Sequence, residues 1–191
     1  MKKIMTVALS LVCLMSALSA QEKGMYEKKY DLLVSKFGPA GVGIENLLDN
    51  WEKEDSTNIR LLYARFDFLF TKAQSSKVVI KSEKKYLGMD PVLSLKDSTG
   101  NDVHYYQESV FDDDLYGQAL KAADKAIGLW PDRLDFRFLK LNAYIAYEKE
   151  SPDMALAGLL ALLEENSGRK KPWIYNDAEA EKSFFADAMQ E

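Results

Sequence analysis

His104 is the single histidine of this 191-residue chain, so any histidine-dependent chemistry has to use it. A Ser/His/Asp triad needs a serine beside that imidazole, and Ser94, Ser98 and Ser109 lie nearby in the sequence. None of these serines stands in the glycine-flanked turn that exposes a nucleophilic serine. The sequence therefore predicts a structural histidine, placed in a strand beside two tyrosines.

Metal and thiol chemistry is limited by the same shortage of ligands. One histidine and one cysteine, Cys13, are too few for a structural zinc site. Asp97, Thr99 and Asn101 offer the alternating oxygens of a calcium loop. However, Gly100 comes one residue early and the closing glutamate is missing. We expect a turn at this position, and neither a metal nor a cofactor.

Charge and composition narrow the function classes further. The chain has 30 acidic and 25 basic residues and a pI near 5.1, which argues against a nucleic-acid binder. Gly38, Gly41 and Gly43 form no phosphate loop, because Pro39 interrupts them and no strand precedes them. Acidic residues are abundant enough that a carboxylate pair for glycoside hydrolysis stays open as an alternative.

The first twenty residues have the order of a secretory signal peptide. Lys2 and Lys3 precede an apolar run over residues 4–15, and small residues follow up to Ala20, the expected cleavage site. Cleavage there takes the net charge from −5 to −7, since two lysines leave, and it also removes Cys13. We expect an exported protein, periplasmic or secreted, with no integral membrane segment after signal removal. A retained anchor and a lipoprotein at Cys13 are the alternatives.

The mature part, residues 21–191, reads as paired amphipathic helices with an insert. Apolar residues spaced by three and four predict helices at 26–37, 42–53, 59–73, 115–129, 133–147 and 153–163. The insert, about residues 75–113, contains a predicted β-hairpin with strands at 91–96 and 103–106. Asp177 is expected to cap a last helix, whose apolar positions are Ala180, Phe184, Phe185 and Ala188. Because that helix runs to Glu191, we expect the natural chain to continue.

Small residues in the second half follow a recognisable spacing. Ala119, Ala123, Ala126 and Pro131 are separated by 4, 3 and 5 residues. This resembles the second helix of a tetratricopeptide repeat, in which small residues let paired helices approach closely and proline follows the helix. The resemblance extends over residues 116–165. It implies a mainly α, right-handed stack of α-hairpins with a small β-hairpin insert.

The following repeat matches less well. Tyr144 and Ala155 resemble the late aromatic and the small opening residue of this family. Arg137 replaces the usual aromatic, and Lys140-Leu141 replaces a Leu-Gly pair. Another α-hairpin bundle is therefore the alternative fold. The segments 116–119 and 130–138 are also similar to exported bacterial repeat proteins of unknown role, a likeness that implies no activity.

In this family the first helix of each repeat lines a concave face. The resemblance places Asp135, Phe138, Asn142 and Ile145 on that face. It implies a non-enzymatic interaction or assembly module that binds a protein or peptide partner there. The alternatives are a carboxylate-based glycan hydrolase of the envelope and an accessory domain of a longer protein. Phe138 and Ile145 could instead pack against a neighbouring helix.

Overall fold

The computed structural model describes residues 24–149 and 151–179, and the expected signal peptide lies outside them. The chain divides into two compact units, residues 1–68 and 69–191. The described residues are mainly helical and include a small three-stranded antiparallel sheet. The mainly helical expectation is thus confirmed.

The first unit is built from helices, the first two of which are joined by a glycine-containing turn. It contains a helix over residues 24–37, helix α2 (Ile44–Glu54) and most of helix α3 (Ile59–Ala73). Gly43 precedes α2 with φ of 86°, a left-handed conformation that glycine adopts without strain. The core stacks the Tyr26 ring on Trp51, with ring centres 5.9 Å apart. Asn58 caps α3 by accepting a hydrogen bond from the Leu61 amide at 3.1 Å.

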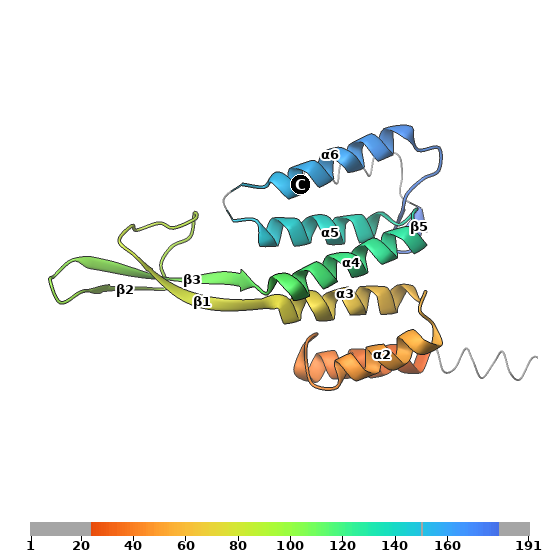
Figure 1. The fold of residues 1–191 in the computed structure, drawn as a ribbon, viewed down its shortest axis with the longest axis horizontal. Coiled ribbons are helices and arrows are strands. Elements are labelled where there is room, and N and C mark those ends of the chain that lie inside the picture. Colours follow the sequence, from red (N-terminus) through yellow and green to blue (C-terminus); the bar gives the residue numbers. More distant parts are fainter. Residues whose placement is uncertain (1–23, 150, 180–191) are drawn as a thin grey trace, which may run out of the picture. The chain divides into compact units, whose positions relative to one another are not determined.

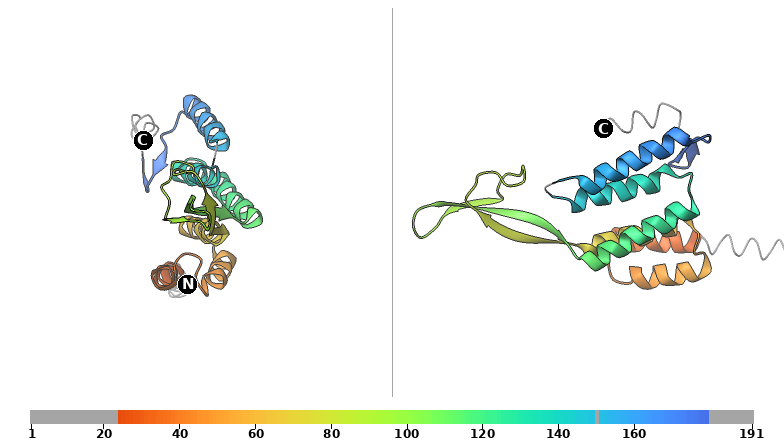
Figure 2. Two further views of the ribbon diagram at one scale, coloured as in Figure 1. Left: turned by 90° about the vertical axis from the view of Figure 1, so that its left-hand side faces the viewer. Right: turned by 45° about the horizontal axis from the view of Figure 1, so that its top comes forward.

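The second unit contains a stack of three helices: α4 (Asp113–Leu129), α5 (Leu134–Tyr147) and α6 (Asp153–Gly168). Figures 1 and 2 show the three lying side by side, in chain order. Asp112 begins α4 by accepting a hydrogen bond from the Leu115 amide at 2.9 Å. We call α4, α5 and α6 together the helical stack.

Small residues set how closely the helices of the stack approach. Ala119, Ala123 and Ala126 are at most 1% exposed. Gly158 on α6 lies so close to α5 that a Cβ at this position would come within 2.7 Å of the Leu141 side chain. The buried cluster of the stack is formed by Leu134, Leu141, Leu162 and Trp173.

A β-sheet is inserted between α3 and α4. Strands β1 (Gln74–Lys81), β2 (Leu93–Lys96) and β3 (Asp102–Phe111) pair antiparallel in the order β1-β3-β2. The register places Ile80 and Leu93 on either side of Tyr105. Strand β1 follows α3 directly, and Figures 1 and 2 show the sheet extending away from the helix ends as an arm. We call residues 74–111 the arm.

The structure confirms part of the predicted insert and corrects the rest. The hairpin of β2 and β3 is present, but it pairs with β1, a strand that the sequence reasoning did not predict. The helix expected after Asp177 is wrong at its start, because β4 (Ile174–Tyr175) and β5 (Ala178–Glu179) form a hairpin there. Asn176 and Asp177 both have positive φ, 48° and 63°, as a two-residue hairpin turn requires. The predicted apolar positions from Ala180 onward lie outside the described residues.

Candidate interaction surface

The four residues predicted for a concave face do not form one accessible surface. Asp135 is 9% exposed, and its carboxylate is held by the Arg133 guanidinium at 2.6 Å. Phe138 packs against the buried cluster of the stack and meets the Tyr175 ring edge-on, with ring centres 6.0 Å apart. Asn142 is exposed and Ile145 is 61% exposed. Two of the four side chains are therefore part of the internal packing.

The packing positions predicted from the repeat pattern lie mostly inside the stack. Ala155 is 7% exposed, and Tyr144 packs on the edge of the buried cluster. Pro131 is exposed in the turn between α4 and α5. These placements agree with closely paired helices.

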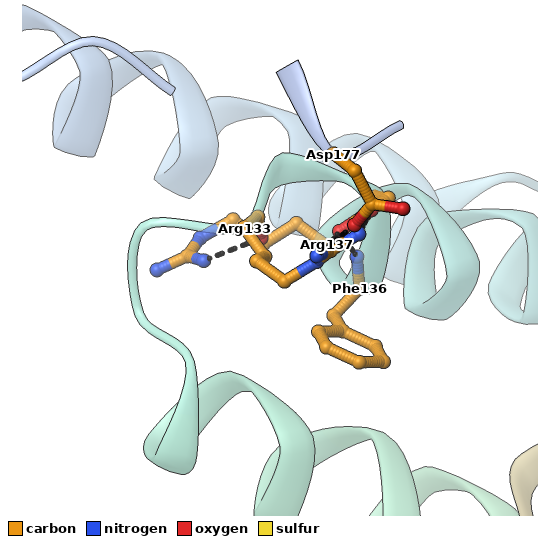
Figure 3. Close-up of polar contacts among 5 residues, drawn as sticks. Arg133, Phe136, Arg137 and Asp177 are labelled. Atoms are coloured by element: carbon orange, nitrogen blue, oxygen red, sulfur yellow. Dashed lines mark hydrogen bonds and ion pairs between the residues drawn. The ribbon is translucent and has the colours of Figure 1, made fainter. Parts of the chain in front are cut away.

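Arg133 and Arg137, which follow Pro131, connect the start of α5 to other parts of the second unit. Arg133 donates to Asp135 and, at 2.6 Å, to Asp177 in the β4–β5 turn (Figure 3). Arg137 donates to the Arg133 carbonyl at 3.1 Å, as Figure 3 also shows, and to both carboxylate oxygens of Glu165. These contacts join the start of α5 to the small hairpin and to α6.

A hollow of about 330 Å³ opens between the helices of the stack, but its charged groups already have partners. Arg137 is paired with Glu165 at 2.6 Å, and Lys140 with Asp124 at 2.5 Å. The Tyr144 ring also lines the hollow. A polar ligand would have to displace these internal ion pairs, so we do not assign a site to the hollow.

His104 contacts one serine but is not part of a catalytic triad. The Ser94 hydroxyl lies 2.7 Å from Nδ1 of His104. Nε2 is buried and has no hydrogen-bond partner among the described residues. Among residues 24–149 and 151–179, no carboxylate bonds to the imidazole as a triad requires. The prediction of a strand histidine beside two tyrosines is confirmed by its place in β3.

Asp97 is occupied within its own turn. One carboxylate oxygen accepts hydrogen bonds from the Thr99 amide, the Thr99 hydroxyl and the Asn101 amide at 2.7–2.9 Å. These bonds, that of the Thr99 hydroxyl first, lower the pKa of Asp97 below its ordinary value. Within the part of the chain that the structure describes, no group of three metal-ligating side chains is found.

One face of the arm is covered by the chain itself. Tyr106 is fully buried, its hydroxyl donates to the Glu83 carbonyl at 2.6 Å, and its ring packs against Tyr86. Nearer the helices, Glu108 accepts a hydrogen bond from Lys149 and lies 3.5 Å from Lys77. The bond from Lys149 lowers the pKa of the Glu108 carboxyl.

An aromatic cluster joins the arm to the helices. The rings of Tyr116 and Tyr147 stack at 4.2 Å, and Phe111 packs against both. Phe70 contacts Phe111 and Tyr116 from the end of α3. The Tyr116 hydroxyl donates to the Ala143 carbonyl at 3.1 Å, and burial raises the pKa of this phenol. The cluster fixes the base of the arm on side chains from α3, α4 and α5.

The opposite face of the arm is apolar and open. Residues that pair directly across strands point to the same face, so the register gathers six apolar side chains there. We call this set the apolar stripe: Val78, Ile80, Leu93, Leu95, Val103 and Tyr105. Four of them are 48–64% exposed, and Val103 and Tyr105 are half-buried.

Sequence reasoning missed the stripe because it did not assign β1 as a strand. The available signal was the run of β-branched residues Val78, Val79 and Ile80 between Lys77 and Lys81. β-Branched residues are enriched in strands. The surrounding serines and lysines made the segment read as a polar loop.

Comparison with known proteins does not assign the chain to a family: no family model, curated protein or solved structure matches it. Among the described residues, no helix has both the length and the apolar character needed to cross a bilayer.

Proposed function

We propose that this chain is an exported helical-repeat protein of the tetratricopeptide type, that it works as a protein–protein interaction module, and that the arm is its contact element. The observation that carries the proposal is the apolar stripe. Contiguous apolar surface of this kind, bordered by polar residues, is typical of a contact site for another molecule. The small-residue packing of α4 against its neighbours supports the repeat-type stack.

The stripe is a better contact surface than the expected concave face. Asp135 and Phe138 are engaged in internal contacts, whereas Val78, Ile80 and Leu95 lie about half or more exposed on the two edge strands of the arm. Strands also hold these side chains in fixed positions, so that little ordering is needed when a partner binds.

The end of the arm favours a protein over a lipid surface as the partner. The turn between β2 and β3 carries Asp97, Thr99 and Asn101, and the hydrogen bonds within the turn favour the ionised form of Asp97. Insertion of this turn into a bilayer would remove a charged carboxylate from water, which is costly. A partner that lies along the stripe leaves the turn in solvent.

Site-specific photocrosslinking tests this proposal. A photoreactive phenylalanine replaces Leu95 in the stripe in one variant, Asn142 in a second and Leu160 on α6 in a third. We expect the first to give a discrete crosslinked product in an envelope extract. Excess unmodified protein should compete with it, whereas excess protein with Leu93→Thr and Leu95→Thr should not.

The two control positions make the outcome decisive. Leu160 is 57% exposed, so it tests whether any exposed apolar site gives the same product. A product from Leu160 equal to that from Leu95 would contradict a specific role of the arm. A product from Asn142 alone would show that the partner binds the predicted concave face and not the arm.

A further inference from the structure

Strand β1 is the long open edge of the arm. It has eight residues and, within the described chain, pairs only with β3, the central strand. The other edge, β2, has four residues and follows Pro91, which cannot donate a backbone hydrogen bond. An edge strand presents a row of N–H and C=O groups that another chain can pair with.

The hydrogen bonding of β1 shows which residues present their backbone outward. The Asp112 amide donates to the Ala73 carbonyl at 2.9 Å, so this pair bonds across the ladder. Because bonded pairs alternate in an antiparallel ladder, Ser75, Lys77, Val79 and Lys81 bond to β3. The N–H and C=O groups of Ser76, Val78 and Ile80 then face away from the sheet.

We propose that β1 accepts an extended segment of a partner protein as a fourth strand, and that this segment carries the pattern acidic, apolar, any residue, apolar, acidic. The inference rests on the proposed function and specifies its partner. The pattern reads the same in both chain directions, so it holds for either orientation of the added strand.

The two apolar positions of the pattern follow from the stripe. Residues of an added strand that lie opposite Val78 and Ile80 share the face of the stripe. Val78 is 64% exposed and Ile80 is 58% exposed. Apolar partner residues here widen the stripe by one strand and cover these two side chains, and cross-strand pairs of this kind stabilise sheets.

The two acidic positions follow from the opposite face of β1. Lys77 and Lys81 point to that face, where Lys77 is 56% exposed at its side chain. The Glu108 carboxylate, 3.5 Å from Lys77, also accepts a hydrogen bond from Lys149, so two lysines share one carboxylate here. Lys81 lies over the Tyr86 ring, with its ammonium 4.4 Å from the ring centre. Residues 77–85 contain four lysines and one glutamate, in a chain whose net charge is −5. This edge therefore attracts an acidic segment.

The same lysines disfavour a second copy of this chain as the added strand. Antiparallel pairing of two β1 strands centred on Val79 places Lys77 opposite Lys81 of the other copy. Like charges directly opposite each other destabilise a sheet. The occupant we infer is thus a different, acidic chain.

Short peptides test the inference on the full chain without its signal peptide. The probe Thr-Glu-Val-Thr-Val-Glu-Thr carries the pattern, and Thr-Lys-Val-Thr-Val-Lys-Thr is the charge-reversed control. We expect the acidic peptide to bind at least about tenfold more tightly by fluorescence anisotropy, a preference that decreases with added salt. Equal binding of the two peptides, or tighter binding of the basic one, would overturn the inference.

Backbone measurements separate strand addition from simple adhesion to the stripe. The acidic peptide should slow hydrogen exchange at the amides of Ser76, Val78 and Ile80. An N-methylated version of the peptide should lose binding at least about tenfold, because it cannot form the ladder. Retained binding after methylation, or unchanged exchange at these amides, would refute the added strand.

A matched pair of variants tests whether the lysines of β1 cause the preference for the acidic peptide. Lys77→Gln on β1 should reduce the preference for the acidic peptide several-fold, whereas Lys96→Gln on β2 should leave it unchanged. Equal effects of the two substitutions would contradict an acidic partner at the β1 edge. If the stripe gives crosslinks but neither peptide binds, the added strand fails and the interaction module stands. If neither crosslinks nor peptide binding appear, both proposals fail.

Discussion

The helical stack and the arm both bury charged groups, but they differ in where their apolar side chains lie. In the stack, Leu134 and Phe136 are fully buried and the buried charges of Arg133 and Asp135 pair with each other. In the arm, His104 and Glu108 are buried, while Val78 and Ile80 face solvent. The stack packs its largest apolar side chains into its own core, although Leu160 on α6 stays 57% exposed, whereas the arm leaves most of its apolar stripe in solvent.

This contrast predicts that the free energy of unfolding resides in the stack. Substitutions there should weaken the whole second unit, and comparable substitutions in the arm should change stability little. Pairs of matched changes, one in each region, measure the difference directly.

Loss of the buried ion pair should have the largest effect. Arg133→Ala leaves the Asp135 carboxylate buried without its guanidinium, which costs about 3–5 kcal/mol in typical buried pairs. The matched change in the arm is Lys96→Ala, which breaks an exposed pair with Asp102 and should cost less than about 1 kcal/mol. Urea unfolding of the two variants gives both values. Similar losses in the two would contradict the division between stack and arm.

Truncation of a leucine sharpens the same comparison. Leu134→Ala opens a cavity in the stack and should cost about 2–5 kcal/mol. Leu95→Ala removes the same atoms from a side chain that is 48% exposed, so we expect a loss below about 1 kcal/mol. Thermal unfolding of both variants provides the measurement. A large loss from Leu95→Ala would mean that the stripe is packed internally.

A smaller effect is expected where the arm joins the stack. Tyr116→Phe removes the buried hydrogen bond to the Ala143 carbonyl and should cost about 1 kcal/mol. Tyr147→Phe removes a hydrogen bond to the exposed Asp113 at 2.9 Å and should cost less. Urea unfolding measures the loss of stability in each variant. A larger loss from Tyr147→Phe would mean that the Tyr147 hydrogen bond contributes more than that of Tyr116.

The smallest effect should be a local response of the arm to pH. The Lys149 hydrogen bond holds the pKa of Glu108 below its ordinary value of 4.5. The ionised form therefore stabilises the arm above that value, and this contribution is lost as pH falls through the lower pKa of the folded state. Protection factors for hydrogen exchange along β3, which correct for the intrinsic pH dependence of exchange, should fall below about pH 4.5. In Glu108→Gln this fall should be absent, and its persistence would assign the response to another group.

The sequence was sufficient to predict the helices of the stack and two of the three strands of the arm. Ala119, Ala123 and Ala126 lie in one buried row because their spacing follows a helix face, and the Gly100 turn marked the hairpin of β2 and β3. Strand β1 was missed because its three β-branched residues, Val78 to Ile80, stand among serines and lysines. Its strand also depends on pairing with a distant segment, since residues 74–81 pair with residues 104–111 of β3.

The incorrect assignments have a common physical cause. Asp177 resembles a helix cap, but its positive φ and its ion pair with Arg133 belong to a turn held by a distant residue. Asp135 looked like an accessible ligand because helix spacing alone does not reveal that Arg133 covers it. The same arginine makes both contacts: it reaches Asp177, which lies 44 residues away in the chain, and Asp135, only 2 residues away. Helix periodicity reports neither contact.

The hydrogen bond between Asp112 and Ala73 has a consequence for how this chain can change. The arm leaves the helices at Ala73 and returns at Asp112, so its two ends lie side by side, joined by this hydrogen bond. A longer, shorter or different arm could therefore connect the same two residues without moving a helix. The binding preference of the arm could thus diversify during evolution while the helices keep their arrangement.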